Sequence, residues 1–153
     1  MKRLGLLCAL ALVWAAAVAG EPFLAIDRQA ARALVEAKSH SSPTILALWS
    51  SDCPHCKGNL KLFADMVAAD AQVRLITVAV EPLSDDLAVP LDRLGVPGKR
   101  FAYGSESPES LAHALDPKWR GELPRTIFFD GRGGRTALSG VVDEAAARRA
   151  LGL

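Results

Sequence analysis

The feature that most constrains this chain is the pair Cys53 and Cys56, separated by Pro54 and His55. A strand-like apolar run at residues 44–49 precedes the pair, and a helical pattern of apolar residues follows it. Two thiols three residues apart at the start of a helix can close a small disulfide and open it again. The partial positive charge of a helix N-terminus stabilises the thiolate of the first cysteine, which is the form that attacks another disulfide. The spacing therefore indicates a redox-active Cys53–Cys56 disulfide.

Three other uses of the pair fit the sequence less well. A structural disulfide that closes so short a loop constrains the unfolded chain little. Zinc needs about four ligands, and one cysteine pair with the scattered His40, His55 and His113 does not supply them convincingly. Haem attachment needs a histidine directly after the second cysteine, where Lys57 stands. We therefore favour a redox dithiol and expect neither a metal nor a cofactor.

The N-terminal segment predicts export. Lys2 and Arg3 form a short basic region, and residues 4–18 are apolar throughout. The small residues at 17–19 meet the needs of a signal peptidase. We therefore expect residues 1–20 to be a signal peptide and the protein to be periplasmic.

Cleavage would leave residues 21–153, which are enough for one compact domain. The alternative is an uncleaved membrane anchor at residues 4–20, a segment at the short edge of what spans a bilayer. Cys8 lies inside that apolar run, so the dithiol would hold the only cysteines of the mature chain. The formal net charge of the whole chain is +1, which gives no reason to expect a nucleic acid partner.

Apolar spacing predicts alternating helices and strands along the chain. A strand at 44–50, a helix at 53–69 and a strand at 73–80 argue for a right-handed parallel crossover, preceded by a helix at 27–38. The elements expected after residue 80 are a helix at 84–94, a short strand at 100–103, a helix at 107–116, a hairpin of strands at 126–130 and 135–142, and a closing helix at 143–151.

This order of elements resembles the thioredoxin fold over about residues 25–152. Three motifs carry the resemblance: Trp-Ser-Ser-Asp-Cys-Pro-His-Cys at 49–56, Leu-Pro-Arg-Thr-Ile-Phe-Phe-Asp at 123–130, and the hairpin glycine Gly133. The resemblance implies an α/β fold, with a central mixed sheet flanked by helices.

The resemblance also implies the residues that meet a substrate. Pro124 would be a cis-proline that faces the dithiol, and Leu123 with Pro124 would shape the substrate groove. Trp49 would either pack beside the dithiol or fill the core, because buried aromatic side chains serve packing first.

Within this superfamily the chain is most similar to the exported TlpA/ResA-like thiol–disulfide oxidoreductases. The stretch from Val80 to Pro124 is longer than in a minimal thioredoxin, which is similar to the helix and strand that this group inserts before the cis-proline loop. The Pro-His dipeptide instead resembles the DsbA-like oxidases, although TlpA-like proteins also carry it. The chain is too short to hold the helical domain of the DsbA group comfortably.

The resemblance assigns roles within the cysteine motif. Cys53 would be the nucleophile and Cys56 would release the substrate. His55, if it is charged or donates a hydrogen bond near the Cys53 sulfur, would stabilise the thiolate and make the disulfide a stronger oxidant. Lys57 and Arg125 would add positive potential if they lie close. The candidate catalytic residues are Cys53, Pro54, His55 and Cys56.

Two carboxylates that help related proteins to move the second cysteine's proton are absent. Ala47 stands where thioredoxin-like and DsbA-like proteins often carry a buried acid, and Asn59 stands where ResA-like proteins carry a glutamate. Deprotonation of Cys56 would then rely on water or on another group.

These features predict a periplasmic, TlpA-like reductase that exchanges disulfides with exported proteins. The resemblance implies apocytochrome c or copper-site assembly proteins as substrates, and a membrane redox donor or acceptor that recharges the dithiol. A DsbA-like oxidase that forms disulfides is the first alternative. A metal-binding chaperone that uses Cys53, Cys56 and a histidine is the second.

Overall fold

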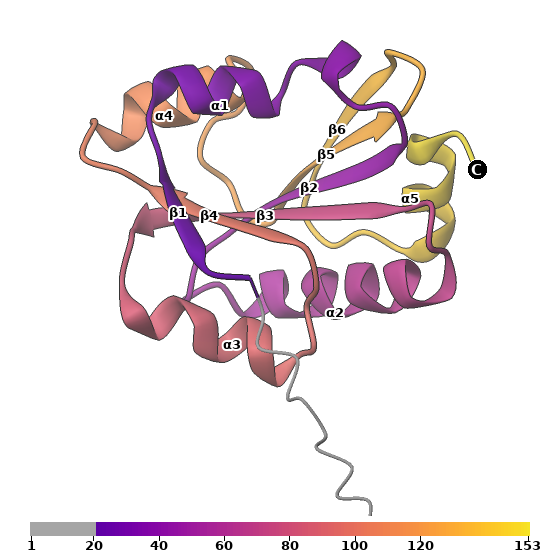
Figure 1. Ribbon diagram of the computed structural model, residues 1–153, viewed down its shortest axis with the longest axis horizontal. Helices are drawn as coiled ribbons and strands as arrows, with labels where there is room; N and C mark the ends of the chain where they lie inside the picture. The colour runs from indigo at the N-terminus through magenta and orange to yellow at the C-terminus, as the bar shows by residue number, and fades with distance from the viewer. Residues whose placement is uncertain (1–20) are drawn as a thin grey trace, which may run out of the picture.

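The computed structural model describes residues 21–153, which form a mixed β-sheet with helices on both faces (Figure 1). The predicted signal peptide or membrane anchor, residues 1–20, lies outside the described residues. Within the described part of the chain, no helix has both the length and the apolar character that a membrane span needs.

Residues 21–153 contain a six-stranded sheet with the spatial order β1-β4-β3-β2-β5-β6. Neighbouring strands from β1 to β2 pair in parallel, whereas β5 is antiparallel to β2 and β6 is antiparallel to β5. The predicted mixed sheet is confirmed. The strands are β1 (Phe23–Ile26), β2 (Pro43–Trp49), β3 (Arg74–Pro82), β4 (Lys99–Tyr103), β5 (Arg125–Asp130) and β6 (Arg135–Ser139).

Side-chain caps fix where several helices begin. The side chains of Asp27, Ser107 and Asp143 each accept a hydrogen bond from the backbone N–H three residues further on, which satisfies a donor that the helix itself leaves free. The helices are α1 (Arg28–Leu34), α2 (Pro54–Ala69), α3 (Ala88–Arg93), α4 (Pro108–Leu115) and α5 (Glu144–Leu151), with 3₁₀ turns at Ala37–Ser39 and Asp85–Leu87.

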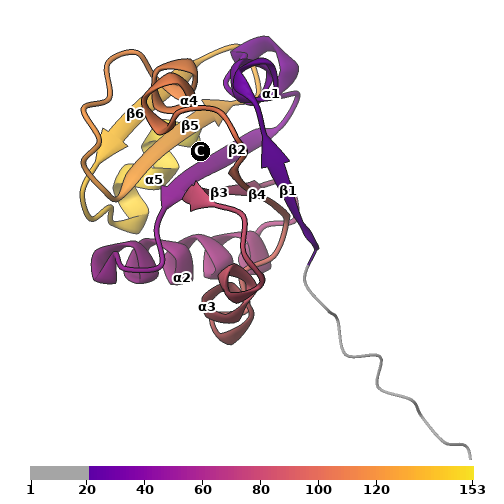
Figure 2. The same cartoon turned by 90° about the vertical axis from the view of Figure 1, so that its left-hand side faces the viewer.

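Two apolar cores lie on opposite faces of the sheet, and β2 contributes to both. Ile45, Ala47 and Trp49 join the core that contains residues of α2, α3 and α5, whereas Leu46 and Leu48 join the core beneath α1 and α4. Figure 1 shows α1 and α4 above the sheet and α2 and α3 below it, and Figure 2 shows the same layers from the side. The burial of β2 on both faces explains its continuous apolar sequence.

The predicted helix and strand insertion is present as α3 and β4. Strand β4 lies between β1 and β3, so the insertion adds a strand on the side of the sheet away from β5. Gly98 leads into β4 with a φ of +89°, and a Cβ there would collide with the Leu75 carbonyl oxygen. The close approach of these two backbones therefore requires glycine.

Three element boundaries differ from the sequence-based expectations. Strand β1 was not predicted, because it is a four-residue edge strand with two exposed positions and gives no periodic signal. The helix expected at 27–38 is shorter and continues into a 3₁₀ turn. The strand expected at 135–142 ends at Ser139, because the Val142 N–H donates to the Asn59 side chain instead of to a strand.

Candidate active site

The two cysteines lie where β2 ends and α2 begins. Cys53 is the N-cap of α2, Pro54 occupies its first turn, and Cys53 and Cys56 form a disulfide with sulfurs 2.05 Å apart. Proline suits this position because its missing N–H would have no helical partner. The Cys56 N–H donates to the Cys53 sulfur over 3.1 Å. The same contact would stabilise a thiolate at Cys53 once the disulfide opens.

The two cysteines differ in accessibility. Cys53 is 9% exposed and Cys56 is 1% exposed, so Cys53 is the more accessible of the two residues. This difference fits the predicted order of a nucleophilic Cys53 and a resolving Cys56. Pro54 and His55 lie between them on the exposed face of the helix start.

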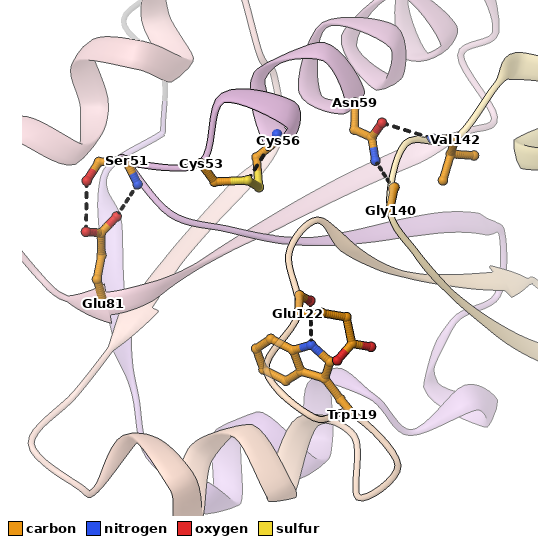
Figure 3. The surroundings of a disulfide bond; sticks show 9 residues. All are labelled: Ser51, Cys53, Cys56, Asn59, Glu81, Trp119, Glu122, Gly140 and Val142. Carbon is orange, nitrogen blue, oxygen red and sulfur yellow. Dashed lines mark hydrogen bonds between the residues drawn. A yellow bond between two sulfur atoms is a disulfide. The ribbon is translucent and has the colours of Figure 1, made fainter.

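A carboxylate that the sequence analysis missed holds the turn before Cys53. Glu81, near the end of β3, accepts hydrogen bonds from the Ser51 N–H over 2.6 Å and from the Ser51 hydroxyl over 2.9 Å (Figure 3). In the sequence, Glu81 was visible only as a lone acid directly after an apolar run. Parallel neighbours β2 and β3 end at the same edge of the sheet, so this acid lies near the segment that follows β2. Glu81 thus fixes the turn that delivers Cys53 to the helix.

The strand register brings the proline loop to the same edge. Leu48 pairs with Arg125, so Trp49 and Pro124 continue from adjacent strands at the end where the dithiol lies. The Leu123–Pro124 peptide bond is cis. Pro124 is buried, and the half-buried Leu123 packs against both cores.

A polar network anchors this proline loop. The Arg125 guanidinium donates to Asp116 over 2.6 Å and to the Ser139 hydroxyl over 2.7 Å, and Ser139 donates to Glu122 over 2.6 Å. Arg135 adds a second positive charge 3.6 Å from the Asp116 carboxylate. The Arg125 charge is thus paired with Asp116, and the contribution of Arg125 to the potential at the dithiol stays a prediction.

The network also sets the ionisation of Asp116. Burial alone would raise the pKa of Asp116, but hydrogen bonds from Arg125 and from the Lys118 N–H, with the charges of Arg135 and Arg125, outweigh it and lower the pKa. Asp116 therefore stays ionised and keeps the loop bound.

Asn59 ties the dithiol helix to the loop after β6. Its side chain donates to the Gly140 carbonyl over 3.0 Å and accepts from the Val142 N–H over 3.1 Å (Figure 3). Asn59 is 2% exposed, and Ala47 is 3% exposed in the core that includes both cysteines. At these two positions the structure has an amide clamp and an apolar core residue, and neither can carry a proton for Cys56. Val141, on the loop that Asn59 holds, is 71% exposed.

The predicted substrate contact by Trp49 needs correction. Trp49 is 0% exposed and belongs to the same core as Cys53 and Cys56, so it packs behind the dithiol and presents no surface to a substrate. Sequence alone could not separate these roles, because both place an aromatic residue directly before the motif.

Clusters of metal ligands were sought among the described residues as well. Within residues 21–153, no group of three or more histidine, cysteine, aspartate or glutamate side chains is arranged to hold a metal ion.

Comparison with known proteins places the fold. Neither a protein-family model nor a curated protein matches the sequence. A thioredoxin-related protein from Neisseria meningitidis serogroup B matches the structure with a TM-score of 0.57 and 19% identity, over 73% of this chain and 84% of that chain. A secreted Mycobacterium tuberculosis disulfide oxidoreductase homologous to E. coli DsbE matches with a TM-score of 0.55 and 16% identity, over 79% and 86%.

A secreted thiol-disulfide isomerase from Corynebacterium glutamicum also matches, with a TM-score of 0.56 and 16% identity, over 74% of this chain and 70% of that chain. This chain has a thioredoxin-like fold. The fold class predicted from the sequence is confirmed.

The Glu81 clamp makes a testable prediction. Glu81→Ala removes both acceptors from Ser51, so the free energy of unfolding should fall by about 1 kcal/mol and exchange of the Ser51 amide hydrogen should accelerate. Glu81→Gln keeps one carbonyl acceptor and should lie between the wild type and the alanine variant. Urea unfolding and hydrogen exchange measure the two effects; equal exchange rates in all three proteins would show that the clamp does not order the turn.

The lowered pKa of Asp116 predicts a pH-dependent contribution to stability. A carboxyl whose pKa falls on folding stabilises the protein above its unfolded value of 3.8, and this stability is lost as the pH falls through the folded value. Asp116→Asn should therefore cost about 1–3 kcal/mol at neutral pH, and the cost should shrink below about pH 4.

Urea unfolding across this pH range measures the difference. The matched control is Asp65→Asn, which removes an exposed carboxylate paired with Lys61 on α2 and should cost little at any pH. A cost of Asp116→Asn that stays constant down to acid pH would contradict the assignment.

Proposed function

We propose that this protein is an exported, periplasmic thiol–disulfide oxidoreductase of the thioredoxin-like superfamily, similar to the TlpA/ResA reductases. The observation that supports this proposal is the Cys53–Cys56 disulfide at the start of α2, with Cys53 the more exposed cysteine and the Leu123–Pro124 loop at the same edge of the sheet. The α3–β4 insertion supports the TlpA/ResA comparison, because this group inserts a helix and a strand at the same point of the chain.

In the reducing direction, the Cys53 thiolate attacks one sulfur of a substrate disulfide. The substrate S–S bond breaks, its electron pair leaves on the other substrate sulfur, and a mixed disulfide joins Cys53 to the substrate. The Cys56 thiolate then attacks the Cys53 sulfur and displaces the second substrate thiolate. The substrate gains two electrons, and the protein ends with the Cys53–Cys56 disulfide.

The surrounding residues hold this chemistry in place. Glu81 and Asn59 fix the two ends of the reactive segment, and the Asp116–Arg125 pair fixes the proline loop across from it. The backbone next to Pro124 would pair with an extended substrate segment as an added strand. With Ala47 and Asn59 in place of acids, the proton of Cys56 leaves to water or to another group.

The partners follow from the same proposal. Exported proteins with disulfides are the substrates, with apocytochrome c and copper-site assembly proteins as the classes that the resemblance suggests. A membrane redox protein would restore the reduced dithiol after each turnover.

A disulfide-forming oxidase is the second candidate, and the Pro54-His55 dipeptide supports it. His55 is exposed and lies two residues after Cys53. A charged imidazole near Cys53 would stabilise the reduced form and would make the disulfide more oxidising.

The cysteine variants test the mechanism. Cys53→Ser should abolish disulfide exchange, because no accessible nucleophile remains, whereas Cys56→Ser should accumulate mixed disulfides that cannot resolve. Non-reducing gels and mass spectrometry of the trapped adducts measure both results. Undiminished exchange in both variants would disprove the assigned roles.

The reduction potential of the Cys53–Cys56 disulfide decides whether the protein acts as a reductase or as an oxidase. Equilibration with glutathione redox buffers should give a value of about −200 mV or lower for a reductase. A value near about −120 mV would instead identify a disulfide-forming oxidase with a TlpA-like architecture.

A further inference from the structure

Glu81 brings a negative charge to the turn that precedes the disulfide. Its carboxylate accepts hydrogen bonds from the Ser51 N–H over 2.6 Å and from the Ser51 hydroxyl over 2.9 Å (Figure 3). Both donors are neutral, and Glu81 forms no ion pair within residues 21–153. The hydrogen bonds therefore hold the carboxylate in place and leave its charge uncompensated.

The hydrogen bonds of the turn place this charge close to Cys53. The Cys53 N–H donates to the Ser50 carbonyl over 3.2 Å, which closes a turn that contains Ser51. Two residues of chain span at most about 7 Å, so the Glu81 oxygen that binds the Ser51 N–H lies within about 10 Å of the Cys53 nitrogen. The chain geometry thus sets an upper limit on the distance between the charge and the start of α2.

The charge of Glu81 acts against the features that favour a thiolate at Cys53. Cys53 is the N-cap of α2, and the Cys56 N–H donates to its sulfur over 3.1 Å. The positive end of the helix and this N–H both stabilise a negative sulfur. A negative charge nearby destabilises it. Glu81 is therefore placed to make the Cys53 thiolate less stable than the helix alone would make it.

Other charged side chains near the cysteines are more open to solvent. Asp52, His55 and Lys57 are exposed, whereas Glu81 is half-buried. On the proline loop, the charge of Arg125 is paired with a carboxylate. Water and salt screen exposed charges more than partly buried ones. Among the charged side chains named here, Glu81 is thus the unpaired one that solvent screens least.

We propose that Glu81 is a positioning residue whose carboxylate destabilises the Cys53 thiolate and thereby lowers the reduction potential of the Cys53–Cys56 disulfide. When the reduced protein meets oxidised glutathione, its two thiols lose two electrons and two protons and form the disulfide, and oxidised glutathione becomes two glutathione thiols. A less stable thiolate makes this oxidation of the protein more favourable. The inference rests on the proposed function and gives a physical reason for the reducing direction, because Glu81 opposes the effect of a charged His55.

Two variants separate the charge of Glu81 from the geometry of the turn. Glu81→Gln keeps one acceptor for Ser51 and removes the charge, whereas Ser51→Ala removes the hydroxyl donor and keeps the charge. Each weakens the clamp by one hydrogen bond, so the structural effects are matched. The control for charge removal is Asp65→Asn, which removes an exposed carboxylate of α2 roughly 17 Å along the helix from Pro54.

Two measurements on the full protein report the thiolate and the potential. The first is the pH dependence of Cys53 alkylation in the reduced protein, and the second is equilibration with glutathione redox buffers. In Glu81→Gln, the pH midpoint of alkylation should fall by about half a unit. The equilibrium constant for oxidation by oxidised glutathione should fall about threefold, which raises the reduction potential by about 14 mV. Ser51→Ala and Asp65→Asn should keep the wild-type midpoint and potential.

The outcomes separate this inference from the proposed function. A Glu81→Gln protein with the wild-type midpoint and potential overturns the inference and leaves the oxidoreductase function standing. Equal shifts in Glu81→Gln and Ser51→Ala also overturn it, because they would assign the effect to the geometry of the turn. A wild-type protein whose cysteines do not exchange with glutathione overturns the proposed function and this inference with it.

Discussion

Strand β2 pairs with a neighbouring strand on each side, and this pairing determines which chain segments meet around the disulfide. Its parallel pairing with β3 and antiparallel pairing with β5 bring three chain segments to one end of the sheet. Cys53 follows from β2, Glu81 from β3, and Pro124 precedes β5. A shift of one residue in either ladder would move each β2 side chain from one core to the other, so the two cores enforce the geometry of the site.

Polar contacts then fix the loops that the sheet brings together. Asn59 holds the loop after β6 against α2, and Asp116 holds the proline loop through Arg125. These contacts are shielded from solvent at Asn59 and Asp116, which makes them stronger than equivalent surface contacts. The dithiol therefore lies between loops that internal hydrogen bonds hold in place.

Much of this fold could be predicted from the sequence because its signals are local. The apolar run of β2, the cysteine spacing and the caps at Ser107 and Asp143 each act within a few residues of the chain. The parts that could not be predicted depend on distant contacts. Glu81 meets Ser51 across 30 residues and Asn59 meets Val142 across 83, and no spacing rule connects such positions.

Trp49 shows a different limit of sequence reasoning. Its position before the cysteine motif indicated a place near the dithiol, and it does share a core with both cysteines. Whether its indole faces solvent or the interior depends on the strand register and on the helices above it. The sequence can therefore place a residue in the correct region and still leave its role open.

The Asn59 clamp has a consequence for the lifetime of the covalent complex. The side-chain amide of Asn59 cannot accept a proton at physiological pH, so Asn59 cannot act as a base for Cys56. The resolving step would then depend on the ionisation of Cys56 itself and would slow as the surroundings become more acidic. A partner joined to Cys53 would remain attached longer in an acidic compartment than in a neutral one.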